Sequence, residues 1–173
     1  MDVRIAFLNG DLYEVVYITQ PMGFKVDGKE HIVCKLKKSM YGLKQASRQW
    51  YLKFDKVVTA HGFKENIVDQ CIYIRVIESS YIFLVWYVDD ILIASNDTDL
   101  LFETKDMLSS HFDTKELGDA SHILGIHILR DRSNCILRLS QINYIDRVLK
   151  RFNMHCCASG KALIVKGDKL SKA

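Results

Sequence analysis

The sequence predicts an α+β fold, with one antiparallel sheet and helices on one of its faces. Three observations predict it. The chain has 173 residues, 49% of them hydrophobic, which is enough to bury a core in one domain. Three segments repeat apolar residues at helical spacing, and short β-branched runs lie between them. With 9 glycines and 1 proline, no linker or internal repeat divides the chain.

The first part of the chain predicts a short strand, a turn and a helix. Residues 2–8 are expected to form the strand, and QPMGF at 20–24 the turn. Residues 43–61 predict the helix, with Gly62 as its C-terminal stop. Seven of its residues fall at helical spacing: Leu43, Ala46, Trp50, Phe54, Val57, Val58 and His61.

The middle of the chain predicts paired strands. Residues 71–77 are β-branched, ESS at 78–80 is typical of a turn, and 81–88 form a second strand. A third strand is expected at 91–95. We expect a hairpin in which Asp89 and Asp90 are the two turn residues.

The last part predicts two more helices around two strands. Residues 98–112 predict a helix capped by Asn96 or Asp97. Strands are expected at 121–130 and 135–139. A third helix is predicted at 141–153, and no period continues from residue 154. The side chains expected to point inward from this last helix are Ile142, Ile145, Val148, Leu149 and Phe152.

Composition narrows the class of protein. No apolar run reaches the roughly 18 residues of a membrane span. The five cysteines are odd in number and form no C-x-x-C pair, which favours reduced thiols inside a cell. Residues 34–56 and 147–173 each carry a net charge of +6, so a polyanion could lie along them. A solvated helix face explains such charges equally well.

Asp89 and Asp90 interrupt the most apolar run, YIFLVWYVDDILIAS at 81–95. Two neighbouring carboxylates are costly to bury unless something neutralises them, and a divalent cation such as Mg²⁺ does so well. A further ligand has to come from elsewhere. Asp2 is the preferred candidate, and Asp11 in NGD the alternative. A pair of aspartates alone is also typical of an exposed turn.

Five motifs in order carry a resemblance to a known family: MDVRIAFLNGDL, VCKLKKSMYGLKQASRQWY, YVDDILIAS, LGDASHILGIHILRDR and LSQINYIDRVLKRFNM. Together they resemble the reverse transcriptase of copia-type (Ty1/copia) LTR retrotransposons, over roughly residues 1–155. The resemblance implies a right-hand polymerase palm with a ferredoxin-like sheet at 1–139. It implies the start of a thumb or connection at 140–173, with a disordered C-terminal part.

The resemblance also implies a reaction, which is two-metal nucleotidyl transfer from a dNTP to a primer 3′-hydroxyl, with two Mg²⁺ ions or Mn²⁺ in their place. Asp2, Asp89 and Asp90 match the family's catalytic, metal-binding aspartates. Contacts to dNTP, template or primer are implied for Phe7, Lys44, Gln45, Arg48 and Tyr87, and Phe7 resembles the aromatic that lies under the sugar.

The implied partners are dNTPs and an RNA or DNA template with its primer, and no membrane. The parent polyprotein would also carry protease, integrase and RNase H, and would work in cytoplasmic virus-like particles. Because the chain begins one residue before Asp2, we expect missing fingers, a shortened thumb and a frayed first strand. The alternatives are a catalytically inactive element relic with residual nucleic-acid binding, and a generic α+β binding module.

Overall fold

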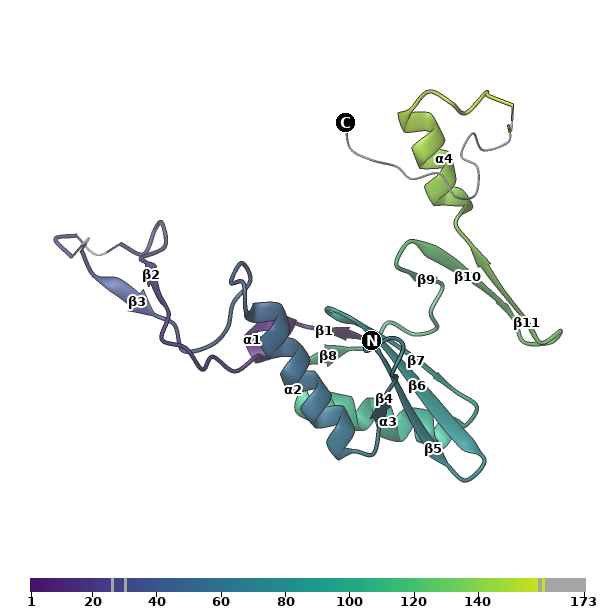
Figure 1. Cartoon of the computed structure of the whole chain (residues 1–173), viewed down its shortest axis with the longest axis horizontal. Coiled ribbons are helices and arrows are strands. Elements are labelled where there is room, and N and C mark those ends of the chain that lie inside the picture. Colours follow the sequence, from purple (N-terminus) through teal and green to yellow (C-terminus); the bar gives the residue numbers. More distant parts are fainter. Residues whose placement is uncertain (26, 30, 159, 161–173) are drawn as a thin grey trace. The chain divides into compact units, whose positions relative to one another are not determined.

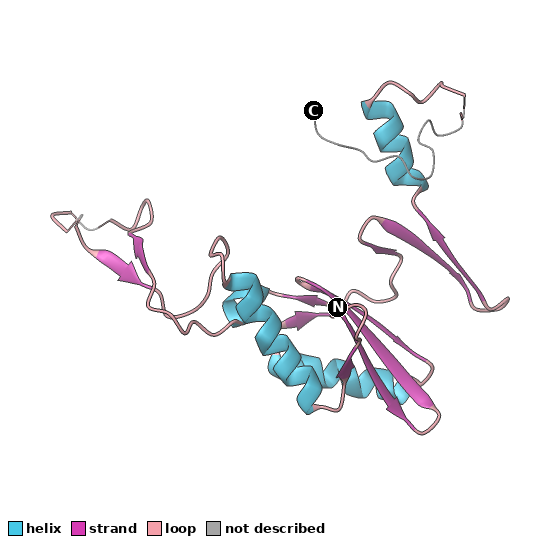
Figure 2. Cartoon of the chain, viewed as in Figure 1, coloured by secondary structure: helices cyan, strands magenta, loops and turns pink. Residues whose placement is uncertain are grey.

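The computed structural model describes residues 1–25, 27–29, 31–158 and 160. The chain divides into two compact units, residues 1–119 and 120–173. The described residues form four helices and three antiparallel sheets (Figures 1 and 2). The predicted α+β class is therefore confirmed. The prediction of one sheet is wrong, since a three-stranded and a two-stranded sheet form in addition to the main, six-stranded one.

The main sheet has six strands and belongs to the first unit. Its order is β4 (Lys64–Glu65), β5 (Ile72–Ile77), β6 (Ser80–Tyr87), β7 (Asp90–Ser95), β1 (Asp2–Val3) and β8 (Thr114–Lys115). Strands β5, β6 and β7 form a meander through turns of two residues. Strand β1 comes first in the chain and yet lies between β7 and β8. The first strand is thus inserted among later ones.

Three helices belong to this unit: α1 (Ala6–Asn9), α2 (Ala46–Ala60) and α3 (Thr98–His111). Helix α3 begins as predicted, because the Asp97 carboxylate accepts hydrogen bonds from the backbone N–H groups of Asp99 and Leu100. Helix α2 begins three residues later than predicted. It ends at Ala60, two residues before Gly62, whose φ of 84° is the left-handed conformation that glycine adopts without strain.

The core lies between these helices and one face of the sheet. Along β6 the side chains of Ile82, Leu84 and Trp86 are buried, as strand alternation requires. They form one cluster with buried residues of α2 and α3. Aromatic rings dominate its centre: Trp50 and Phe54 of α2 both contact Trp86 and also Phe112, which follows α3.

The first strand is shorter than predicted. Residues 2–8 were expected to be extended, but β1 ends at Val3 and α1 starts at Ala6. Between them Ile5 takes a φ of 49°, and the Arg4 N–H donates to the Asp113 carbonyl at 2.8 Å. The strand therefore stops because the chain turns away from the sheet.

The remaining elements pair locally. Strands β2 (Tyr17–Thr19) and β3 (Val33–Lys35) form a two-stranded ribbon. The second unit contains β9 (His122–Ile123), β10 (Ile126–Asp131), β11 (Ile136–Ser140) and α4 (Ile142–Arg151). The predicted strand 121–130 is broken at Leu124 and Gly125, which both have positive φ.

Helix α4 differs from its prediction in burial. Ile142, Ile145 and Phe152 were expected to point inward, but they are at least half exposed, and α4 has no fully buried residue. The reason is that none of the described residues of the second unit is buried, so they form no core around this helix. None of the described helices combines the length and apolar character needed to cross a membrane.

Candidate functional site

The three candidate aspartates lie on neighbouring segments of the main sheet. Asp2 in β1 is paired opposite Asp90 in β7. On one side of this pair the Val3 N–H donates to the Asp89 carbonyl at 2.7 Å. On the other side Met1 and Ile91 exchange two hydrogen bonds, each of 2.8 Å. Strand β1 is hydrogen bonded on both edges, to β7 and to β8.

The turn before Asp90 is displaced by one residue from its prediction. Val88 and Asp89 form the two-residue turn, and Asp90 already pairs with Tyr87 in the ladder. Val88 has a φ of 54°, which is costly for a β-branched residue. Its carbonyl accepts hydrogen bonds from the indole N–H groups of Trp50, at 2.7 Å, and Trp86, at 2.9 Å. Core tryptophans thus hold the turn in this conformation.

The Asp89 carboxylate lies in an environment that disfavours its charge. Partial burial raises its pKa, and the nearby negative charges of Asp2 and Asp90 raise it further. One contact acts in the opposite direction, since the Tyr41 hydroxyl donates to the two carboxylate oxygens of Asp89 at 3.3 and 3.4 Å. The site therefore has an excess of negative charge that a cation would relieve.

Tyr41 is the site residue that sequence reasoning missed. Its ring lies on that of Phe7 in α1, with centroids 4.5 Å apart. Burial and the charge of Asp89 raise the pKa of its hydroxyl. Tyr41 precedes Gly42 inside the YGLKQ motif, and that position was the only signal in the sequence that could have found it. Phe7 and Tyr41 together form an aromatic pair beside Asp89.

The other predicted substrate residues are less closely connected to the aspartates. The Gln45 amide donates to Glu14 at 3.3 Å, and Lys44 and Arg48 are exposed around the start of α2. Tyr87 is half exposed and lies opposite Asp90. Among the described residues, no hydrogen bond or ion pair joins Lys44, Gln45 or Arg48 to an aspartate of the site.

The donor atoms suit a hard divalent cation, because three carboxylates from one corner of a sheet offer only oxygen ligands. In the described part of the chain, however, no group of three His, Cys, Asp or Glu side chains is arranged to hold a metal ion. The Asp89 carboxylate faces Tyr41 instead. The residues fit Mg²⁺ in chemistry and in strand register, and their side chains would have to converge to bind it.

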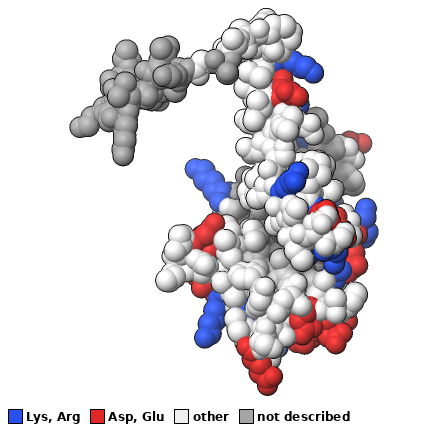
Figure 3. Space-filling model, turned by 90° about the vertical axis from the view of Figure 1, so that its right-hand side faces the viewer, with Lys and Arg blue, Asp and Glu red and all other residues white. Residues whose placement is uncertain are grey.

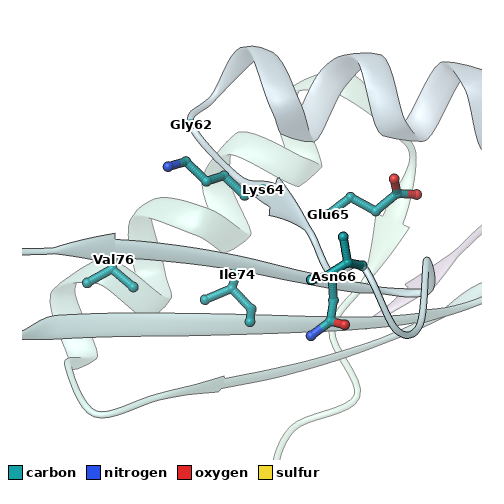
Figure 4. Close-up of a pocket in the computed structure, with 7 residues that line it drawn as sticks. Gly62, Lys64, Glu65, Asn66, Ile74 and Val76 are labelled. Atoms are coloured by element: carbon teal, nitrogen blue, oxygen red, sulfur yellow. The ribbon is translucent and has the colours of Figure 1, made fainter.

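A cavity lies elsewhere in the first unit. It has a volume of about 370 Å³ and is formed by β4, β5 and the segment around them (Figure 4). Its lining is Gly62, Lys64, Glu65, Asn66, Ile67, Ile74 and Val76. It contains none of the three aspartates, so it is unrelated to the candidate site.

Comparison with known proteins identifies relatives along most of the chain. The family model described as reverse transcriptase (RNA-dependent DNA polymerase) matches residues 1–166. The chain is 52% identical over 173 residues to the Retrovirus-related Pol polyprotein from transposon TNT 1-94 of Nicotiana tabacum, covering 99% of this chain and 13% of that protein.

Two more distant relatives extend this comparison. The Pol polyprotein from transposon RE2 of Arabidopsis thaliana is 42% identical, with 89% of this chain and 10% of that protein covered. The Transposon Ty1-NL2 Gag-Pol polyprotein of Saccharomyces cerevisiae is 28% identical, with 97% and 10% covered. The chain thus spans about an eighth or less of each of these polyproteins. No solved structure matches it significantly.

Proposed function

The chain belongs to the reverse transcriptase family, among the Pol polyproteins of Ty1/copia-type retrotransposons, and we propose that it carries the metal-binding strands of an RNA-directed DNA polymerase. The reaction is transfer of a nucleotide from a dNTP to the 3′-hydroxyl of a primer on an RNA or DNA template. One observation carries the proposal. Strand β1 places Asp2 opposite Asp90 and next to the turn that holds Asp89.

The reverse transcriptase family generally uses a divalent metal. In this chain Asp2, Asp89 and Asp90 would hold Mg²⁺, with Mn²⁺ as a substitute. When bound, two such ions activate the attacking hydroxyl and neutralise charge on the leaving pyrophosphate. The raised pKa of Asp89 supports this role, because like-charged neighbours make a cation the natural partner of the site. To bind it, the Asp89 carboxylate would leave the Tyr41 hydroxyl.

Five further residues are proposed to bind the substrates. The Phe7 ring, supported by Tyr41, would lie against the sugar of the incoming nucleotide. Lys44 and Arg48 are exposed cations and would bind phosphate groups. Tyr87 lies opposite Asp90 and would contact the primer terminus. Gln45, now bonded to Glu14, would exchange that partner for the dNTP or template.

Primer extension tests the proposal. The full chain is incubated with an oligo(dT) primer on poly(rA), labelled dTTP, and Mg²⁺ or Mn²⁺. We expect incorporation by the unaltered chain and none by Asp89→Asn. Asp106→Asn, which removes an exposed carboxylate of α3, is the matched control and should retain activity. Equal incorporation by the unaltered chain and Asp89→Asn, or none by the unaltered chain, would contradict the assignment.

A second function, nucleic-acid binding without turnover, is favoured by the exposed lysines Lys35, Lys37 and Lys38 together with Lys44. On the face drawn in Figure 3, however, the described lysine and arginine side chains stand apart from one another, with acidic side chains among them. Binding through phosphates should weaken steeply as salt rises. This function is tested separately from catalysis by measuring the affinity of a catalytically inactive chain for a primer–template at several salt concentrations.

A further inference from the structure

Two histidines of the first unit lie together at the ends of two helices. His61 directly follows α2, and His111 is the last residue of α3. Their rings have centroids 5.0 Å apart and planes inclined by 78°. They are separated by fifty positions in the sequence, and neither belongs to the site of the three aspartates. The packing of α2 and α3 therefore brings together two histidines that no local sequence motif predicts as a pair.

The hydrogen bonds of both rings determine which nitrogen is free. The Nδ1 atom of His61 lies 2.8 Å from the Val57 carbonyl oxygen, and that of His111 lies 2.9 Å from the Met107 carbonyl oxygen. A carbonyl oxygen only accepts, so Nδ1 carries the proton in each ring. In the neutral imidazoles the lone pair is then on Nε2. This arrangement, with one nitrogen donating to a backbone carbonyl, is the usual support of a metal-binding histidine.

The spacing of the rings agrees with shared coordination. With a metal–nitrogen distance of about 2.0–2.1 Å and a ring centre about 1.1 Å behind the nitrogen, two imidazoles on one tetrahedral ion have centres about 5 Å apart. The observed separation is 5.0 Å. Planes that are nearly perpendicular, rather than stacked, are compatible with lone pairs that meet at one point.

We propose that His61 and His111 bind a divalent late transition-metal ion, of the class of Zn²⁺, Ni²⁺ or Cu²⁺, which links the C-terminal ends of α2 and α3. Imidazole nitrogen suits these ions and not Mg²⁺. Water completes the coordination, because His111 is exposed and no third His, Cys, Asp or Glu ligand lies in place among the described residues. This proposal is independent of the polymerase proposal.

The nearby charge does not oppose such an ion strongly. The Arg75 side chain lies near Gly62, the residue after His61. Its guanidinium is paired with the Glu103 carboxylate at 2.9 Å, which neutralises it locally. The helix C-termini add further support, because their free carbonyls favour positive charge.

A second histidine pair provides a matched control. His122 and His127 lie opposite each other on β9 and β10, with ring centroids 4.5 Å apart. Their planes are inclined by only 12°, so the rings are stacked and their lone pairs lie in two separate, nearly parallel planes. The pair has the same chemistry and the wrong geometry.

The test titrates Ni²⁺ alone into the reduced full chain. Calorimetry gives the affinity, and paramagnetic broadening of the imidazole NMR signals gives the location. We expect broadening of the His61 and His111 signals. Because a chelate needs both rings, His61→Gln and His111→Gln should each lose at least about tenfold in affinity, and the double variant little more. His122→Gln/His127→Gln should keep the affinity.

Thermal unfolding keeps the test decisive if a variant is unstable. Ni²⁺ should raise the melting temperature of the unaltered chain and not that of His111→Gln, whose exposed side chain can change without loss of the fold. Unchanged affinity in His111→Gln would overturn the proposal. So would loss of binding in the His122→Gln/His127→Gln control, or on alkylation of the five cysteines.

Discussion

The Val88 carbonyl offers a sharp test of how the turn at Val88 and Asp89 is held, because two tryptophans donate to the same atom. Trp50 and Trp86 place their indole N–H groups 2.7 and 2.9 Å from this oxygen. Replacing either one by phenylalanine keeps an aromatic ring in the core and removes one donor. Replacing both leaves the oxygen without either indole.

The magnitudes follow from what each variant leaves behind. A single Trp→Phe change removes a hydrogen bond worth about 0.5–1.5 kcal/mol and leaves a small cavity, so we expect a loss of about 1–3 kcal/mol in the free energy of unfolding. In the single variants the carbonyl keeps its other donor. In the double variant it keeps neither, which adds about 1–2 kcal/mol for an unsatisfied acceptor. The combined loss should therefore exceed the sum.

The double variant's loss can be larger or smaller than the sum of the two single losses. This sign distinguishes an acceptor shared by the two indoles from a direct contact between their rings. The rings of Trp50 and Trp86 also contact each other, with centroids 6.4 Å apart. Loss of a direct contact is counted in both single variants, so it makes the double variant less costly than the sum. Trp50 and Phe112 serve as the control, since their rings are 5.0 Å apart and Phe112 has no such donor. Trp50→Phe/Phe112→Leu should show no excess.

Urea unfolding of the full chain, followed by far-ultraviolet circular dichroism, measures these free energies without relying on tryptophan fluorescence. The reasoning is refuted if Trp50→Phe and Trp86→Phe add within about 0.5 kcal/mol, or if their sum exceeds the double variant. A further readout is Mn²⁺ binding, which should weaken in the double variant because Asp89 lies in the turn that the two indoles hold.

Three other predictions concern single residues. Leu84→Ala, at a fully buried position of β6, should lower the free energy of unfolding by about 2–5 kcal/mol in urea, whereas Leu52→Ala on the exposed side of α2 should cost much less. Hydrogen bonds from the Ser80 hydroxyl and from the Leu100 and Asp99 N–H groups lower the pKa of Asp97. The stability that ionised Asp97 contributes to the folded chain is therefore present above the ordinary aspartate pKa, and it is lost as the pH falls through the lowered pKa. Asp97→Ala should therefore lower the melting temperature at neutral pH, and the difference should shrink near pH 3; an equal difference at both pH values contradicts this reasoning. Tyr41→Phe keeps the contact with Phe7 and removes the hydroxyl from Asp89, so calorimetry should show Mn²⁺ binding strengthened by roughly a few-fold; weaker binding would mean that the hydroxyl supports the metal site.

The elements that were predicted well are those with local signals. Helix α3 begins at the Asp97 cap, and α2 ends before Gly62 as predicted. Strands β5 and β6 and their turn also agree closely with their predicted ranges. In each case the periodicity, cap or turn residue acts within a few positions of the element itself. For these elements, residues close to each other in the sequence were sufficient for the prediction.

The elements that were missed or displaced depend on distant partners. Strands β4 and β8 have two residues each and exist only because they pair with β5 and β1. The turn before Asp90 moves to Val88 and Asp89 because two core indoles donate to the Val88 carbonyl. Strand 2–8 ends early because Ile5 takes a positive φ and the chain turns away from the sheet there. No local pattern reports a hydrogen bond across tens of residues.

The candidate site divides in the same way. The sequence alone determined which carboxylates are available, Asp2, Asp89 and Asp90, and the family whose motifs they match. Only the tertiary structure decided that Asp2 lies opposite Asp90, that the Tyr41 hydroxyl donates to the Asp89 carboxylate, and that the ring of His61 contacts that of His111. The physical reason is that residue type sets what an atom can bind, whereas the pairing of strands and the packing of helices set which atoms meet.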